Sequence, residues 1–114
     1  MPYTIDGQPV EIGKEPQLKD GTLWVPLRPL IEALGGSIEW DGTEQRVTIN
    51  LDNFITSFRL GQTTVNREAW SSELQAAPYE ESGDTWVPVR FFNDPLKYAL
   101  NVDLNTKQVD ISRP

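Results

Sequence analysis

Apolar and polar residues alternate with a period of two along much of the chain, a pattern typical of strands with one buried face. Residues 46–51 are the clearest example, since Val47, Ile49 and Leu51 alternate there with polar residues. Comparable segments recur along the whole sequence, so strand should exceed helix. We expect strands at residues 3–5, 8–12, 22–26, 37–40, 46–51, 54–60, 63–65, 68–70, 85–88, 102–104 and 108–112.

Short turn signals separate these segments. Asp6-Gly7 and Asp41-Gly42 are dipeptides of the kind that joins two antiparallel strands. Asn66-Arg67 and Asn105-Thr106 hold corresponding places between later segments, so we expect turns there as well. The order of short strands and tight turns predicts a mainly antiparallel sheet.

The apolar period changes to that of a helix after Pro26. Leu27, Leu30, Ile31 and Leu34 fall at i, i+3, i+4 and i+7, and Gly35-Gly36 follow them as a stop. Arg28 and Glu32 stand four residues apart on this helix and predict an exposed ion pair of small energy, about 0.3–0.5 kcal/mol. Ile38 and Trp40 of the following strand are expected to point inward against the helix.

One segment is written twice. Trp24-Val25-Pro26-Leu27-Arg28 returns as Trp86-Val87-Pro88-Val89-Arg90, an offset of 62 residues (86 − 24). Such self-similarity predicts an internal duplication. The two repeats would cover about residues 1–51 and 58–114 of a single domain. Since about 50 residues are marginal as an independent unit, we expect the repeats to share one core.

The second repeat departs from the first after Arg90. Pro95 disfavours helix at Asp94, so we expect a helix that begins at Pro95, with Leu96, Ala99 and Leu100 inward. Arg90 and Asp94 would form the second ion pair. The fold class is therefore predicted as α+β, an internally duplicated and mainly antiparallel sheet curled around one or two short helices.

Charge and composition narrow the possible functions. The net charge is −7, which argues against nucleic acid as the main partner, because the phosphate backbone rewards clustered Lys and Arg. No apolar run approaches the roughly 18 residues of a membrane span, and no signal peptide pattern precedes the first strand. The chain contains no cysteine and no histidine, so we expect no cofactor and no imidazole or thiolate chemistry.

Both copies together resemble the copper amine oxidase N-terminal-like domain, also called the stalk domain. The matching motifs are D-G-x-x-W-V-P-L-R-x-x-x-E-A-L-G at residues 20–35, I-x-W-D at 38–41, V-T-I at 47–49 and V-P-V-R at 87–90. The sequence departs from the family at Phe91–Lys97 and at Asn66-Arg67. The resemblance implies antiparallel sheets curled around a helix, on bacterial exported or cell-envelope proteins. It implies no copper, because the metal and quinone of the oxidases belong to another domain.

Four aromatic residues are candidate contacts for a partner or a sugar: Trp24, Trp70, Tyr79 and Trp86. Trp24 and Trp86 point away from Val25 and Val87, yet a curled sheet covers both faces, and tryptophan is usually mostly buried. We therefore favour a folding role for these two. The acidic residues carry no calcium-loop pattern, and we interpret them as solvated surface; they include Asp41, Glu44, Glu80, Glu81, Asp84, Asp103 and Asp110.

The sequence thus predicts a non-catalytic module, extracellular or on the bacterial cell envelope. Its expected task is to space, anchor or dock other domains of a larger exported protein, or to bind a protein partner. The alternative is a carbohydrate- or cell-wall-binding module that uses exposed tryptophan side chains. A small hydrolase that uses Asp and Glu is the least favoured interpretation.

Overall fold

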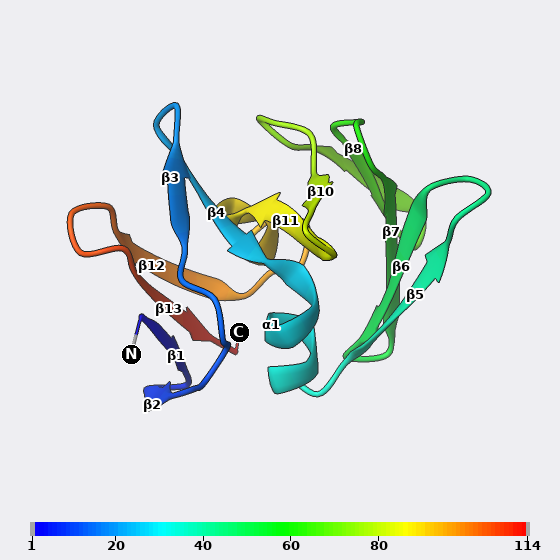
Figure 1. The fold of residues 1–114 in the computed structure, drawn as a ribbon. Coiled ribbons are helices and arrows are strands. Elements are labelled where there is room, and N and C mark those ends of the chain that lie inside the picture. Colours follow the sequence, from blue (N-terminus) through cyan, green and yellow to red (C-terminus); the bar gives the residue numbers. More distant parts are fainter. Residues whose placement is uncertain (1, 114) are drawn as a thin grey trace.

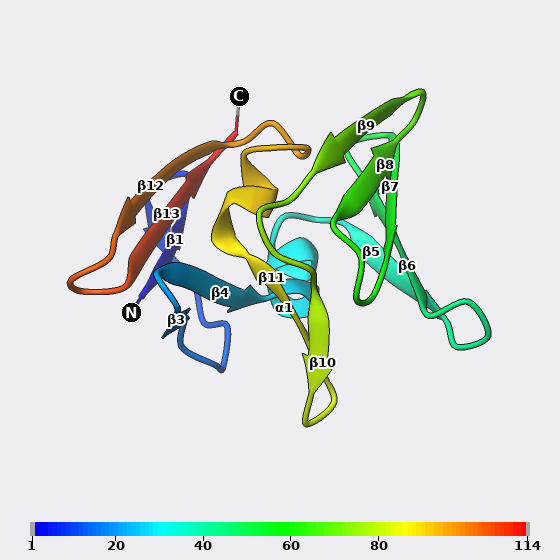
Figure 2. The same cartoon turned by 90° about the horizontal axis from the view of Figure 1, so that it is seen from above.

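The structure, a computed structural model, describes residues 2–113, and about half of the chain lies in strands. The strands form three small sheets around a central helix (Figures 1 and 2). The α+β class and the predominance of antiparallel strands are confirmed.

The first sheet brings the two ends of the described chain together. Its order is β12-β13-β1-β2, and β1 pairs with β13 in parallel while its other pairs are antiparallel. Asp6-Gly7 forms the β1–β2 turn as predicted, and both of its residues take positive φ. The strands are β1 (Tyr3–Ile5), β2 (Gln8–Pro9), β12 (Ala99–Asp103) and β13 (Gln108–Ser112).

The second sheet places the two repeated segments side by side. Its order is β10-β11-β4-β3, and β4 pairs antiparallel with β11 so that Val25 lies opposite Val87. Trp24 faces Pro88 and Pro26 faces Trp86, so a local two-fold axis passes through the valine pair. The strands are β3 (Gln17–Lys19), β4 (Thr22–Pro26), β10 (Tyr79–Glu81) and β11 (Asp84–Pro88).

The third sheet is the largest and is antiparallel throughout, in the order β5-β6-β7-β8-β9. The turn expected at Asn66-Arg67 is wrong by two residues, because β8 continues through Arg67 and the chain turns at Glu68-Ala69. Glu68 holds this turn: its carboxylate accepts the Ile55 N–H at 2.6 Å and its own N–H donates to the Ile55 carbonyl at 3.1 Å. The strands are β5 (Ser37–Asp41), β6 (Arg46–Leu51), β7 (Phe54–Arg59), β8 (Thr64–Arg67) and β9 (Trp70–Glu73).

Helix α1 (Leu27–Ala33) lies between the outer sheets, and the predicted apolar stripe is its buried face. Arg28 and Glu32 form the predicted ion pair at 3.8 Å, with both side chains more than half exposed. Gly36 lets the chain pass close to β6 after the helix, because an added Cβ there would lie 2.7 Å from the Asn50 carbonyl oxygen.

The helix expected from Pro95 is wrong. The second repeat has only a 3-10 helix, η1 (Val89–Phe92), followed by turns in which Lys97 takes positive φ. The Asn93 amide donates to the Tyr98 carbonyl and closes this loop, and the next residues enter β12. Leu96 is buried as predicted, but Ala99 is exposed and Leu100 is half-buried.

The predicted Arg90–Asp94 ion pair is also wrong. The Asp94 N–H does donate to the Arg90 carbonyl at 2.8 Å, but no ion pair joins the two side chains within the described residues. The Asp94 carboxylate lies 3.7 Å from the Lys97 ammonium group and accepts a hydrogen bond from the Ser72 hydroxyl.

Buried side chains from both halves form one cluster around α1 and η1, with members from all three sheets. The elements of the first half recur 62 residues later in the same order. The first series runs from β1 through α1 to β5 and β6, and the second runs from β8 through η1 to β12 and β13. β7 lies between the two series. The closing hairpin of each series joins the sheet that holds the opening hairpin of the other. A common origin of the two halves stays a prediction.

Trp40 is not a core residue, contrary to our expectation. Ile38 and Trp40 do line the same hollow, so the alternation was correct, and Ile38 packs against the core. Trp40 lies farther along the edge strand β5, which has a neighbour on one side only within the described chain, and 47% of the residue is exposed.

Candidate binding surfaces

The four predicted contact residues separate into two kinds. Trp24 and Trp86 are buried, at 6% and 2% exposure, and offer no face to a partner. Tyr79 is half-buried, meets Trp24 edge-to-face at 4.9 Å, and carries the Lys19 ammonium group 4.4 Å above its ring. Trp70 is the open one, with 74% of the residue exposed. The structure therefore does not bring the four together as one platform.

Trp70 belongs to a hollow at the end of the third sheet. Thr56, Arg67 and Trp70 lie opposite one another on β7, β8 and β9, and directly opposite residues share a face of a sheet. Thr56 is buried, so this is the face that covers the core. Phe54 is on the same face, two residues before Thr56. The inner face of the sheet thus continues past the core and ends in uncovered aromatic side chains.

We call this area the Trp70 surface, a hollow of about 230 Å³ lined by Phe54, Arg67, Glu68, Trp70, Ser72, Pro95 and Lys97. Phe54 is 43% exposed, and the Arg67 guanidinium stacks 4.1 Å above its ring. The Arg67 Nε is buried without a hydrogen-bond partner, so the stack is not fixed by a carboxylate at that atom. An exposed tryptophan beside a stacked arginine is the residue pair that dominates many protein interfaces.

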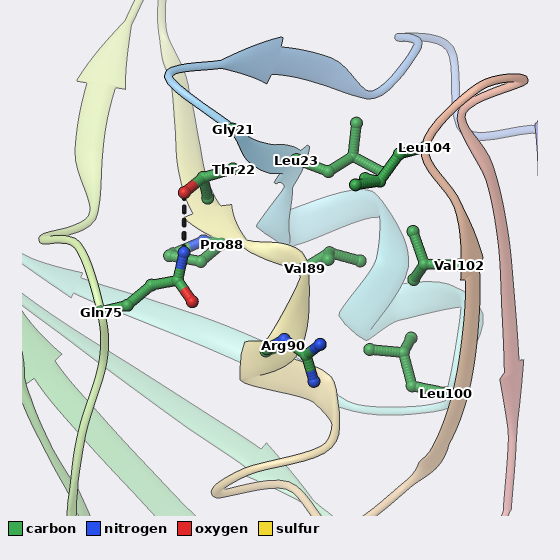
Figure 3. A pocket seen from close by; sticks show the side chains of 10 residues that line it. All are labelled: Gly21, Thr22, Leu23, Gln75, Pro88, Val89, Arg90, Leu100, Val102 and Leu104. Atoms are coloured by element: carbon green, nitrogen blue, oxygen red, sulfur yellow. Dashed lines mark hydrogen bonds between the residues drawn. The ribbon is translucent and has the colours of Figure 1, made fainter.

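A second hollow lies between β12 and the two central strands (Figure 3). We call it the Arg90 groove; its volume is about 400 Å³. Arg90 is exposed at one end, and the Gln75 amide donates to the Thr22 hydroxyl at 2.7 Å on another side. Aliphatic side chains form most of the wall: Leu23, Val89, Leu100, Val102 and Leu104.

A third hollow, the Arg28 groove of about 260 Å³, occupies the equivalent place in the other half. Each groove takes its turn glycine from one repeat and its Pro-x-Arg segment from the other. The local two-fold axis therefore relates the Arg90 groove to the Arg28 groove. Their wall residues correspond at the offset of 62: Gly21 and Gly83, Pro88 and Pro26, Val89 and Leu27, Arg90 and Arg28, Leu100 and Ile38, Val102 and Trp40.

The two grooves differ in charge. Glu80 and Asp84 line the Arg28 groove, and Arg28 itself is paired with Glu32. The lining of the Arg90 groove contains no acidic residue. Four of the six arginines are in ion pairs within residues 2–113, whereas Arg67 and Arg90 are not. The two arginines without a carboxylate partner are therefore the ones at the Trp70 surface and in the Arg90 groove.

The acidic side chains serve the fold. Asp41 accepts the Thr43 N–H at 2.9 Å, and Asp103, 62 residues later, accepts the Asn105 N–H at 2.9 Å, so both hairpins turn by the same device. Glu44 lies 2.6 Å from Arg59, whose hydrogen bond lowers the pKa of that carboxyl, with Arg46 acting in the same direction. No group of three or more potential metal ligands was found within residues 2–113.

Two buried tyrosines have shifted pKa values, and neither lines the Trp70 surface or the Arg90 groove. Burial raises the pKa of Tyr3, and burial together with a hydrogen bond to Asp52 raises the pKa of Tyr98. Burial in the fold is thus the main cause of both tyrosine shifts.

No helix of the described chain has the length and apolar character needed to cross a membrane.

The fold defines a β-rich α+β module with candidate binding surfaces on its sheets. Residues 4–111 match the model of the copper amine oxidase N-terminal domain, and the chain belongs to that family. The family predicted from the sequence is confirmed. The N-terminal domain of copper amine oxidase is a non-catalytic stalk domain.

A curated relative is a protein named "Protease inhibitor" from Brevibacillus choshinensis, which is 26% identical over 102 residues. The match covers 90% of this chain and 31% of the relative. The chain thus spans about a third of the length of the relative that it matches.

Sequence reasoning missed most of the open surface. Trp40 and Phe54 were expected in strands and not as exposed aromatics, and the Arg90 groove was not expected at all. The 62-residue offset was the available signal for the grooves, because it pairs Arg28 with Arg90. Nothing local in the sequence indicates that β5 and β12 become sheet edges.

Proposed function

We propose that this chain is a non-catalytic docking module of a larger exported protein, and that the Trp70 surface is its contact with another domain or a protein partner. The single observation that carries the proposal is the 74% exposure of Trp70 beside Phe54, on the face of a sheet that elsewhere covers the core. Burial of such side chains contributes strongly to association.

Charge supports a partner of particular chemistry. Arg67 and Lys97 line the Trp70 surface together with Glu68; Lys97 is paired with Asp94, whereas Arg67 has no ion-pair partner within residues 2–113. An apolar partner surface flanked by carboxylates would complement this arrangement.

The second candidate function is binding of cell-wall polysaccharide, and the same exposed indole favours it. A flat, open tryptophan is the group on which a sugar ring stacks. The two candidates use the same side chain, so the experiment must separate the ligands and not only the residues.

The test is a calorimetric titration of the chain with purified cell-wall polysaccharide and, separately, with polypeptide that adjoins it in the longer protein. Trp70→Ala is the test variant. Trp40→Ala is the matched control, since Trp40 is also an exposed tryptophan but lies on the opposite edge of the same sheet. Docking predicts polypeptide binding that Trp70→Ala weakens at least tenfold and Trp40→Ala leaves unchanged.

Two results would contradict docking. If the polysaccharide binds with the same dependence on Trp70 and the polypeptide does not bind, the second candidate replaces the first. If Trp70→Ala and Trp40→Ala have equal effects, the Trp70 surface is not the contact.

A further inference from the structure

The Arg90 groove lies beside a strand that has a free edge. β12 pairs with β13 on one side and has no other neighbour in its sheet within the described chain. The outward N–H and C=O groups of an edge strand are a template for an added strand. Leu100 and Val102 lie two residues apart on β12 and both point into the groove.

This spacing matches an extended peptide. Side chains on one face of a strand repeat about every 6.5–7 Å, so a peptide that pairs with β12 presents alternate side chains at the same interval. The aliphatic wall suits apolar peptide side chains, and the groove has no aromatic ring on which a sugar would stack. The shape and composition therefore favour a polypeptide over an oligosaccharide.

Arg90 adds a charge requirement. It is exposed at the end of the groove, no acidic residue lines the groove, and no ion pair within residues 2–113 involves it. A guanidinium pairs best with a carboxylate, often through two parallel hydrogen bonds. In a chain of net charge −7, this is a local site for an acidic group.

We propose that the Arg90 groove binds an extended peptide segment of a partner protein by strand addition to β12, with an acidic side chain of the peptide on Arg90 and apolar side chains against Leu100, Val102 and Leu104. This site is separate from the Trp70 surface. Its success or failure is independent of the docking proposed there, because the two sites share no residue.

The probes are three pools of fluorescent, end-blocked octapeptides that alternate degenerate Leu, Val or Ile with degenerate Ser or Thr. The pools differ at one central position, which is Glu, Gln or Lys. Fluorescence anisotropy should show that the Glu pool binds about tenfold more tightly than the Gln pool, the ratio that about 1.4 kcal/mol produces, and that the Lys pool binds more weakly still.

Arg90→Gln should remove the preference for Glu over Gln. The matched control is Arg28→Gln in the Arg28 groove, which should leave that preference unchanged. Leu104→Ser should weaken all three pools severalfold. Leu104 is 50% exposed, so this substitution should not disturb the fold, and circular dichroism of each variant verifies that point.

Several results would overturn the proposal. One is absence of binding by all three pools, and another is a Glu preference that persists in Arg90→Gln. If Arg28→Gln abolishes binding, the peptide lies in the Arg28 groove and not in the Arg90 groove. If an acidic oligosaccharide such as oligogalacturonate binds as tightly as the Glu pool, and Arg90→Gln removes that binding, the groove is not a site for peptides in particular.

Discussion

The two classes of tryptophan should respond very differently to truncation. Trp86 is 2% exposed and lies in β11 opposite Pro26, whereas Trp70 is 74% exposed. Replacement of a buried tryptophan by alanine costs roughly 3–5 kcal/mol, because apolar burial is lost and a cavity remains. A surface substitution usually changes stability by no more than about 0.5 kcal/mol. Trp86→Ala should therefore remove a large part of the stability, and Trp70→Ala almost none.

Urea unfolding followed by far-ultraviolet circular dichroism measures the difference. With a slope of about 1.5 kcal/mol per molar urea, Trp86→Ala should lower the midpoint by about 2–3 M and Trp70→Ala by less than about 0.5 M. Trp86→Phe, which keeps part of the buried volume, should fall between them. Equal midpoint shifts for Trp86→Ala and Trp70→Ala would refute the division into a buried and an open tryptophan.

Three further outcomes follow from the packing. Gly36→Ala should lower the free energy of unfolding by about 1–3 kcal/mol, because the added Cβ meets a backbone carbonyl oxygen. Gly42→Ala should cost less, because the nearest atom to its Cβ is at 3.5 Å. Equal urea midpoints for the two variants would contradict this. Folding raises the pKa of Tyr98, so the unfolded state releases the phenolic proton at a lower pH than the folded state does. The contribution of Tyr98 to the free energy of unfolding should therefore fall above about pH 10, by up to about 1.4 kcal/mol per pH unit. Tyr98→Phe should make this decline less steep. Fragments 1–61 and 62–114 should each be unfolded by circular dichroism and regain sheet signal when mixed, because all three sheets combine strands of both; a folded single fragment would show separate cores.

Local patterns predicted the elements that local chemistry determines. The alternation at residues 46–51, the Asp-Gly turn at Asp6 and the apolar stripe of α1 all appear in the structure where they were expected. Trp24 and Trp86 are buried, which accords with the folding role favoured for them. The strand alternation, the turn and the helix stripe each follow from residues a few positions apart, whereas the burial of the two tryptophans involves the pairing of β4 with β11.

The errors occur where distant segments decide. Trp40 alternates correctly, but only the position of β5 at a sheet edge leaves its ring uncovered. The turn moved from Asn66-Arg67 to Glu68-Ala69 because Glu68 bonds to Ile55 on another strand. The path after η1 is a different kind of error, because short-range bonds that no apolar period indicates set it, among them the Asn93 amide to the Tyr98 carbonyl.

The candidate surfaces were predictable in part. Trp70 was among the candidate contacts, but its association with Phe54 and Pro95 depends on strand register and on the path of residues 93–98, which no local pattern specifies. The Arg90 groove likewise exists only because β12 lies beside the central sheet. What the sequence did contain was the repeat, which relates this groove to the Arg28 groove.

The proposed docking is tested most directly by photo-crosslinking at Trp70 in cells that produce the protein. A benzoyl-phenylalanine residue replaces Trp70 in one variant and, as the control, Trp40 in another. Docking predicts a light-dependent crosslink to polypeptide, intermolecular or to another domain of the same chain, from position 70 and none above background from position 40. A crosslink from position 70 to polysaccharide alone, or equal crosslinking from both positions, would contradict it.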